Sequence, residues 1–101
     1  MQFLLIALDG TDSEALDRRL GARSAHLENI EKLHGEGKHL FGGAILDDGK
    51  MIGSMMVVDY PSKEIMESEW LASEPYVVGN VWQNIEIKPC AIAQVFIKNN
   101  K

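Results

Sequence analysis

The chain has 101 residues, of which 46% are apolar and 25% are charged. This length corresponds to one domain, and this composition excludes disordered and fibrous proteins. The formal net charge of −5 argues against nucleic acids and anionic membrane surfaces as partners, because both require a basic footprint. We therefore expect residues 1–101 to form a single domain that binds neither nucleic acid nor membrane.

The sequence also predicts a cytoplasmic location. Cys90 is the one cysteine of the chain, so no intrachain disulfide can form, and a reducing compartment is the simplest interpretation. The apolar run at residues 3–8 is too short for a secretion signal and lacks preceding basic residues. No segment approaches the ~20 apolar residues of a membrane span.

The first third of the chain predicts a strand and then a long helix. Residues 3–8 are apolar on both alternating faces, which is typical of a central strand covered on both sides. From residue 12 to about residue 36 the spacing becomes helical, and Gly35 and Gly37 mark the expected end. The expected buried face of this helix consists of Leu16, Leu20, Leu27, Ile30 and His34, with Leu33 at its flank.

Two strands, at residues 39–46 and 51–60, are expected next. Between them, Asp47-Asp48-Gly49-Lys50 indicates a tight hairpin, because Asp-Gly readily supplies positive φ. A second helix should begin after its N-cap Ser62 and bury Ile65, Met66 and Trp70. It should end near Ser73, because Pro75 disfavours helical geometry at Glu74.

The last part of the chain predicts one clear strand. Residues 81–88 alternate, with Val81, Ile85 and Ile87 on one face and Trp82 on the other. Residues 91–97 leave room for a short fifth strand. The order β-α-β-β-α-β predicts an α+β, ferredoxin-like split βαβ fold with an antiparallel sheet and both helices on one sheet face. The other face then exposes Trp82, and a homodimer in which two sheets face each other would cover it.

One side of the first helix carries a polar stripe. Arg19, Arg23 and His26 follow i, i+4, i+7 spacing beside the leucines. Two interpretations remain open. The stripe is either a solvated helix flank or a site at which the arginines hold a carboxylate or phenolate and His26 transfers protons.

The segment after the second helix carries the other candidate group. Glu74 lies just past the expected helix end, and Tyr76 follows two residues later. A long connection sets Glu74 back towards the middle of the first helix, where His26 lies. A histidine–carboxylate pair is what general acid–base chemistry requires. The plainer interpretation is a helix end followed by a turn.

An ordered set of short motifs resembles the YciI-like family. The motifs are Arg19-Leu20, Arg23-Ser24-Ala25-His26-Leu27, Gly42-Gly43, Gly53-Ser54 and Glu74-Pro75-Tyr76-Val77. The resemblance implies a single YciI-like domain over residues 1–101 and a dimeric α+β barrel related in fold to muconolactone isomerase. It also implies an active site around the histidine, which His26 matches, and a carboxylate. Glu74 stands where the family usually carries aspartate.

The resemblance and the residues together suggest a small enzyme of lyase, isomerase or dehydrochlorinase type. One branch of the family looks like a dehydrochlorinase of chlorinated hydroxyquinols, which is a precedent for proton transfer on a small cyclic or anionic substrate. His26 and Glu74 are the expected catalytic pair, in a cleft near the dimer interface. Arg23, Ser54, Tyr76 and Gly43 are the expected substrate-binding residues. The alternative is a non-catalytic module of the same fold that binds a small ligand or has a regulatory role, since fold alone does not decide function.

No metal or cofactor is expected. His26, His34 and His39 could together be metal ligands, but eight residues along a helix place the first two ~12 Å apart. This separation is too large for both to bind one ion. Cys90 has no basic neighbour in the sequence and is expected to be an inert thiol. A related barrel family degrades haem, but nothing in the sequence beyond His26 favours iron ligation.

Overall fold

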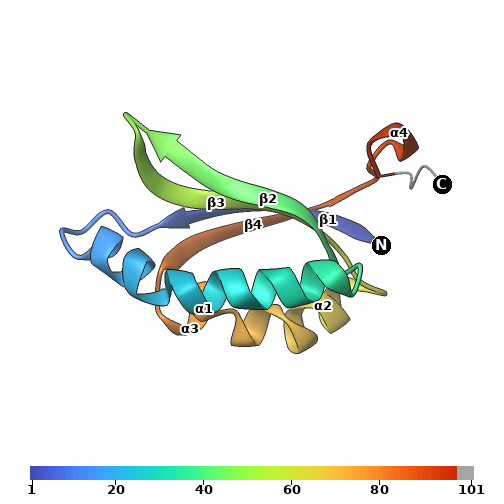
Figure 1. Cartoon of the computed structure of the whole chain (residues 1–101), viewed down its shortest axis with the longest axis horizontal. Helices are drawn as coiled ribbons and strands as arrows, with labels where there is room; N and C mark the ends of the chain where they lie inside the picture. Colours follow the sequence, from blue (N-terminus) through green and yellow to red (C-terminus); the bar gives the residue numbers. More distant parts are fainter. Residues whose placement is uncertain (98–101) are drawn as a thin grey trace.

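The computed structural model describes residues 1–97. A four-stranded antiparallel sheet has the order β2-β3-β1-β4. Three helices cover one face of the sheet, and a fourth follows the end of β4 (Figure 1). The strands are β1 (Gln2–Asp9), β2 (His39–Asp47), β3 (Lys50–Asp59) and β4 (Trp82–Cys90), and the helices are α1 (Ala15–Gly35), α2 (Lys63–Glu69), α3 (Pro75–Val78) and α4 (Gln94–Ile97). The predicted α+β, ferredoxin-like fold is confirmed.

The β2–β3 hairpin turns where the sequence predicts it. Asp47 pairs with Lys50, and the two residues between them have positive φ, 50° at Asp48 and 79° at Gly49. Aspartate tolerates this region and glycine adopts it without a steric penalty, so the local sequence alone specifies the turn.

The helical segment after β3 begins as predicted. The Ser62 side chain accepts a hydrogen bond from the Ile65 N–H at 3.1 Å and caps α2. A 3₁₀ turn over Leu71–Ser73 follows α2. The sequence predicts only a turn after Glu74, whereas the structure forms the short helix α3. Pro75 lies in the first turn of α3, where its missing backbone N–H costs no hydrogen bond within the helix.

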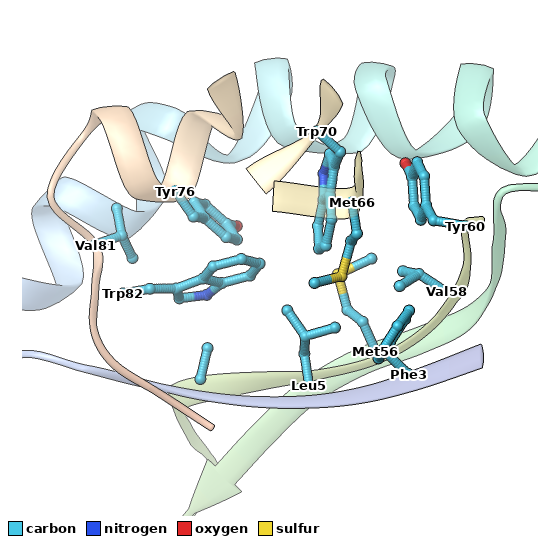
Figure 2. Packing of buried hydrophobic residues seen from close by; sticks show 11 residues of the cluster. Phe3, Leu5, Met56, Val58, Tyr60, Met66, Trp70, Tyr76, Val81 and Trp82 are labelled. Atoms are coloured by element: carbon cyan, nitrogen blue, oxygen red, sulfur yellow. The ribbon is translucent and has the colours of Figure 1, made fainter. Parts of the chain in front are cut away.

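The core lies between the sheet and the helices (Figure 2). Alternate residues of β1 and β3 point towards the helices, and aromatic side chains from the segments around α2, α3 and the start of β4 pack against them. The largest core side chains are Phe3, Leu5, Met56, Tyr60, Met66, Trp70, Tyr76 and Trp82. Both tryptophans of the chain therefore lie in the core, and their indole N–H groups need hydrogen-bond acceptors there.

The predicted buried face of α1 is wrong for the three leucines that it includes, although Ile30 and Leu33 pack against the core as predicted. Leu16, Leu20 and Leu27 are 41%, 52% and 44% exposed, whereas Arg19 and His26 are buried. The buried face is rotated by roughly a quarter turn from the leucines, at ~100° per residue. The physical reason is that carboxylates elsewhere in the fold compensate the two buried basic groups, as described below.

Trp82 also lies on the opposite side from its predicted position. The β1–β4 register shifts between Leu8 and Asp9, so Trp82 pairs with Asp9 and its side chain enters the core, 5% exposed. The sheet face opposite the helices carries other apolar residues instead. They include Leu8 and Met55, which are 42% and 45% exposed.

The predicted fifth strand at residues 91–97 is wrong as well. β4 ends at Cys90, having passed through Pro89, which an edge strand tolerates. The chain then leaves the sheet. The Ile92 N–H donates to the side-chain oxygen of Gln2 at 2.6 Å and so forms no backbone hydrogen bond with β1. α4 follows, with Val95 and Phe96 largely exposed. None of the helices within residues 1–97 is both long enough and apolar enough to cross a membrane.

Candidate functional site

A cavity of about 250 Å³ lies between α1 and the β2–β3 strands. This size suits a ligand of about one ring, since sites for drug-sized ligands start at roughly 300 Å³. Five polar side chains line it, together with apolar and backbone atoms: Arg19, Arg23, His26, Ser54 and Tyr76. Two further histidines line its far end, and no aspartate or glutamate is among the lining residues.

Most of the predicted site residues meet at this cavity. His26, Arg23, Ser54, Tyr76 and Gly43 all line it. Gly43 contributes only backbone, because its pairing with Met55 would turn a side chain towards the open sheet face. Glu74 does not line the cavity and lies fully buried behind His26.

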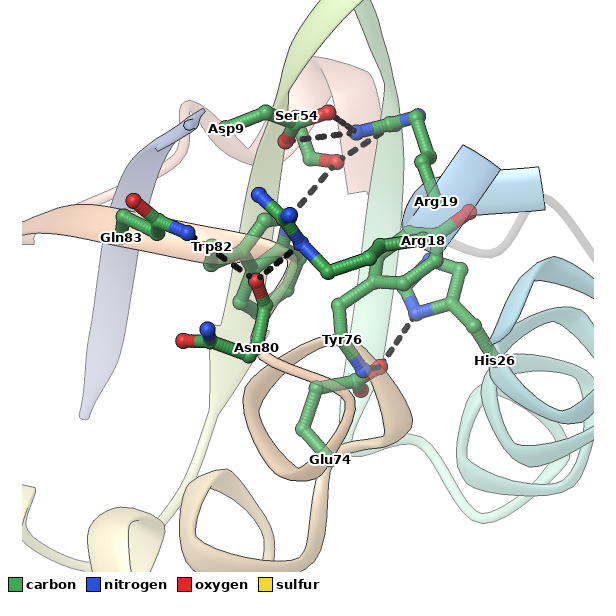
Figure 3. A network of polar contacts seen from close by, with 10 residues as sticks. All are labelled: Asp9, Arg18, Arg19, His26, Ser54, Glu74, Tyr76, Asn80, Trp82 and Gln83. Carbon is green, nitrogen blue, oxygen red and sulfur yellow. Dashed lines mark hydrogen bonds and ion pairs between the residues drawn. The ribbon is translucent and has the colours of Figure 1, made fainter. Parts of the chain in front are cut away.

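Glu74 organises the first of two buried polar groups, which we call the Glu74 cluster: Glu74, His26, Trp70 and Tyr76. Figure 3 shows Glu74, His26 and Tyr76, and Figure 2 shows Trp70. The carboxylate is 0% exposed. Its Oε1 contacts His26 Nδ1 and accepts the Tyr76 backbone N–H at 3.2 Å, and its Oε2 accepts the Trp70 indole N–H at 2.8 Å. The predicted proximity of His26 and Glu74 is therefore observed, within one chain.

The Glu74 cluster also orients the imidazole. Because an ionised carboxylate only accepts, His26 Nδ1 carries a proton and donates it. The other nitrogen, Nε2, has no hydrogen-bond partner among residues 1–97, and His26 lines the cavity. The Tyr76 ring stacks on the imidazole, with 3.9 Å between centroids and 17° between planes, and fixes the ring plane.

Tyr76 brings a phenol to the same wall. Burial raises the pKa of Tyr76, so the hydroxyl keeps its proton at neutral pH and can donate to a ligand. The Arg19 guanidinium carbon lies 4.8 Å from the centroid of its ring. Tyr76 therefore connects the Glu74 cluster to the second buried group.

That second group is the Asp9 cluster: Asp9, Arg19, Ser54 and Trp82 (Figure 3). Arg19 Nη1 donates to both Asp9 carboxylate oxygens at 3.0 Å, and Nη2 donates to Ser54 Oγ at 2.9 Å. The Trp82 indole N–H donates to the same Oγ at 3.1 Å. The side chains of Asp9 and Arg19 are each 3% exposed, so the ion pair is shielded from water.

Sequence reasoning missed the members of these clusters that do not line the cavity. Asp9 ends a strand and is predicted only as a turn residue, although a carboxylate at a strand end is a weak signal for a buried partner. The indole donors of Trp70 and Trp82 have no sequence signal, because their acceptors depend on the tertiary fold.

Arg23 differs from Arg19 in its charge balance. It is exposed and lines the cavity, and it forms no ion pair within the described residues. The charge of Arg19 is offset by Asp9, whereas nothing comparable offsets Arg23. The cavity therefore presents a net positive charge and favours an anionic ligand.

His39 forms part of the far end of the cavity. Burial lowers the pKa of His39 from 6.5 to about 4, so this imidazole is neutral at physiological pH. Its Nε2 lies 3.2 Å from the Tyr60 hydroxyl, and the His34 Nδ1–H donates to its carbonyl at 2.8 Å. Across residues 1–97, no three metal-ligating side chains are grouped as an ion would require.

Comparison with known proteins gives a consistent picture. The model of the YCII-related domain matches residues 1–91. Protein YciI of Escherichia coli O6:H1 is 32% identical over 96 residues, which cover 88% of this chain and 95% of the relative. An uncharacterized protein of Haemophilus influenzae is 27% identical over the same shares.

Two solved structures share the fold. The 5-chloro-2-hydroxyhydroquinone dehydrochlorinase of Burkholderia phenoliruptrix AC1100, in complex with 2,5-dihydroxybenzoquinone, has a TM-score of 0.79 and 23% identity, covering 94% of this chain and 98% of its own. An antibiotic biosynthesis monooxygenase has a TM-score of 0.52 and 18% identity, covering 90% of this chain and 99% of its own. At these identities the likeness concerns the fold.

Proposed function

We propose a function for this chain, which belongs to the family of YCII-related domains that includes the YciI proteins. In this proposal the chain is an enzyme, and His26 transfers protons to and from a small, anionic substrate with a single ring. One observation carries the proposal. The imidazole is fixed through Nδ1 by a buried carboxylate, and its other nitrogen has no partner beside a cavity. This is the arrangement by which a carboxylate selects the tautomer of a catalytic base.

The proposed step is a proton transfer at Nε2. The neutral imidazole takes a proton from an O–H or C–H group of the substrate, and the electron pair of that bond stays on the substrate as an oxyanion or enolate. The imidazolium that forms is stabilised by Glu74, which accepts from Nδ1 throughout. In an elimination, the electron pair then expels the leaving group, and the proton is released from Nε2 to solvent.

Cavity size and charge support the proposed substrate class. Arg23 provides a positive charge for a carboxylate or phenolate, and the volume of about 250 Å³ admits about one ring. The related dehydrochlorinase holds 2,5-dihydroxybenzoquinone, a ligand of this size. We therefore take this compound and 5-chloro-2-hydroxyhydroquinone as first probes.

The test measures proton transfer directly. We expect the protein to accelerate solvent deuterium exchange into the ring C–H positions of 2,5-dihydroxybenzoquinone, followed by NMR, and to release chloride from 5-chloro-2-hydroxyhydroquinone. His26→Asn should slow both by ~10²- to 10⁴-fold, as for other general bases. Glu74→Gln should slow them less, because Nε2 remains in place.

The same experiment separates the enzyme from the ligand-binding alternative. A binding module would take up 2,5-dihydroxybenzoquinone in calorimetry without exchange above the background rate. Exchange that is equal in the wild type and His26→Asn would also contradict the proposal, because the catalytic base would then lie elsewhere.

We further propose that the chain acts as a homodimer through the open sheet face. Leu8 and Met55 expose apolar surface there, opposite the helices. Light scattering should give twice the chain mass of 11.2 kDa, and Met55→Lys should lower it towards one chain. The control is Val78→Lys, at a position 72% exposed on α3, which should leave the mass unchanged. A wild-type mass of one chain at micromolar concentration contradicts the dimer.

A further inference from the structure

The Ser54 hydroxyl is held in an unusual way. A serine hydroxyl has two lone pairs that accept and one hydrogen that donates, and in most sites it rotates to suit its partner. Here both lone pairs are engaged, by Arg19 Nη2 at 2.9 Å and by the Trp82 indole N–H at 3.1 Å. Guanidinium and indole N–H groups only donate, so neither can take up the serine hydrogen.

The hydroxyl hydrogen therefore needs another acceptor. Within residues 1–97, Ser54 donates no hydrogen bond, to Asp9 or to any other residue. Ser54 is 4% exposed and lines the cavity. Because buried polar groups are normally hydrogen-bonded, the cavity is the place where this donor finds its acceptor.

The surroundings prevent the hydroxyl from reversing its role. Arg19 is anchored by the buried carboxylate of Asp9 and lies over the Tyr76 ring. Trp82 is packed in the core against Tyr76 and Trp70. Neither donor can swing away to free a lone pair without breaking core contacts.

We infer that Ser54 is a dedicated hydrogen-bond donor to a carbonyl or oxyanion oxygen of the ligand, and that Trp82 and Arg19 are positioning residues that set this polarity. The inference rests on the proposed function, since it specifies a contact for the same anionic ring. Two donors on Oγ also polarise the O–H bond and strengthen it as a donor. A developing negative charge on the ligand oxygen would therefore be stabilised at Ser54.

Two isosteric probes test the polarity. Isonicotinate N-oxide and 4-aminobenzoate each have a six-membered aromatic ring with a carboxylate para to the second group, and the same number of non-hydrogen atoms, but the N-oxide oxygen accepts whereas the amino group donates. Calorimetry should show that the wild type binds the N-oxide about tenfold more tightly, because the amino group would leave the Ser54 hydrogen unpaired. In Trp82→Phe, Oγ regains a lone pair, and the preference should fall to about twofold or less.

The matched control is Trp70→Phe, which removes the other core indole N–H, the one bound to Glu74. This variant should keep the tenfold preference whatever it does to stability. A wild type that binds both probes equally overturns the inference but leaves the proposed function standing. Failure to bind either probe at millimolar concentration removes the anionic-ring ligand class, and both proposals then fail.

A measurement without ligand covers the case in which Trp82→Phe does not fold. The Trp82 indole N–H should exchange with solvent at least about tenfold more slowly in the wild type than in Ser54→Ala, because its acceptor is Oγ. Equal exchange rates would mean that the indole does not occupy Oγ, and the inference would be wrong.

Discussion

The two buried clusters are built to the same plan but handle charge differently. Each joins a carboxylate to a basic side chain of α1 and includes an indole N–H, and the pairs are Asp9 with Arg19 and Glu74 with His26. Arginine stays protonated in proteins, whereas histidine is the side chain that gains and loses a proton near neutral pH. One cluster therefore holds a permanent positive charge, and the other contains the side chain that we propose transfers protons.

The largest expected effect comes from breaking the permanent pair. Asp9→Asn leaves the guanidinium of Arg19 buried without a counter-charge, and we expect the free energy of unfolding to fall by about 3–5 kcal/mol. Urea unfolding followed by circular dichroism measures this, with Asp59→Asn at a half-exposed position as the control. A loss below about 1 kcal/mol would mean that water reaches Arg19.

A histidine without a carboxylate partner provides the next contrast. His39 has a pKa of about 4 in the folded chain and about 6.5 when unfolded, so below pH 6.5 the unfolded chain takes up the proton first. The free energy of unfolding should therefore fall as pH drops from 6.5 to 4 and level off below it, by up to about 3 kcal/mol in total.

The measurement for His39 is a difference. Unfolding free energies of the wild type and His39→Gln are compared from pH 8 to pH 3.5, so that the titration of carboxylates cancels. The two curves should run parallel above pH 7 and converge or cross below pH 6. Curves that stay parallel throughout would show that His39 becomes protonated without penalty.

Neutralising the other carboxylate should cost less than Asp9→Asn. Glu74→Gln leaves one N–H donor facing the amide nitrogen but leaves no permanent cation such as arginine without a counter-charge, so we expect about 2 kcal/mol. Glu69→Gln, at an exposed carboxylate of α2, is the control. If Glu74→Gln were as costly as Asp9→Asn, His26 would behave as a fixed cation, and the difference between the clusters would disappear.

The smallest effect belongs to a third pair, which lies on the surface. Arg18 donates a bidentate hydrogen bond to Asp12, from Nη2 to Oδ1 at 2.7 Å and from Nη1 to Oδ2 at 2.8 Å. This bond lowers the pKa of Asp12 to about 2. Arg18→Gln should return that pKa towards 3.8 in an NMR titration, while the melting temperature stays within experimental error, because water screens an exposed pair. A clear drop in melting temperature would mean that burial is not what distinguishes the three pairs.

The parts of the fold that depend on neighbouring residues are predictable from the sequence. The hairpin follows from Asp48-Gly49 and the start of α2 from Ser62, since a turn type and a cap each need only a few residues. The proximity of His26 to Glu74 is also predictable, from the topology and the order of the motifs. Their role in catalysis stays a prediction.

The parts that depend on distant partners are not predictable in this way. Helical periodicity counts apolar residues, so it selects Leu16 and Leu20, whereas Arg19 is buried because Asp9 compensates its charge. The side of the sheet on which Trp82 lies depends on one irregularity in strand pairing, and the spacing of apolar residues does not reveal it. Both errors concern residues of the Asp9 cluster.

The central position of β1 has a consequence for how the chain folds. β1 pairs with β3 on one side and with β4 on the other. Residue 2 can therefore pair only once residue 59 and then residue 90 have been synthesised. The β2–β3 hairpin closes over two residues and can form early, whereas β1–β4 pairing closes the longest loop and should form late. During synthesis on the ribosome, Asp9 and Trp82 then come together only after residue 82 has emerged, so the Asp9 cluster is completed after the β2–β3 hairpin has formed.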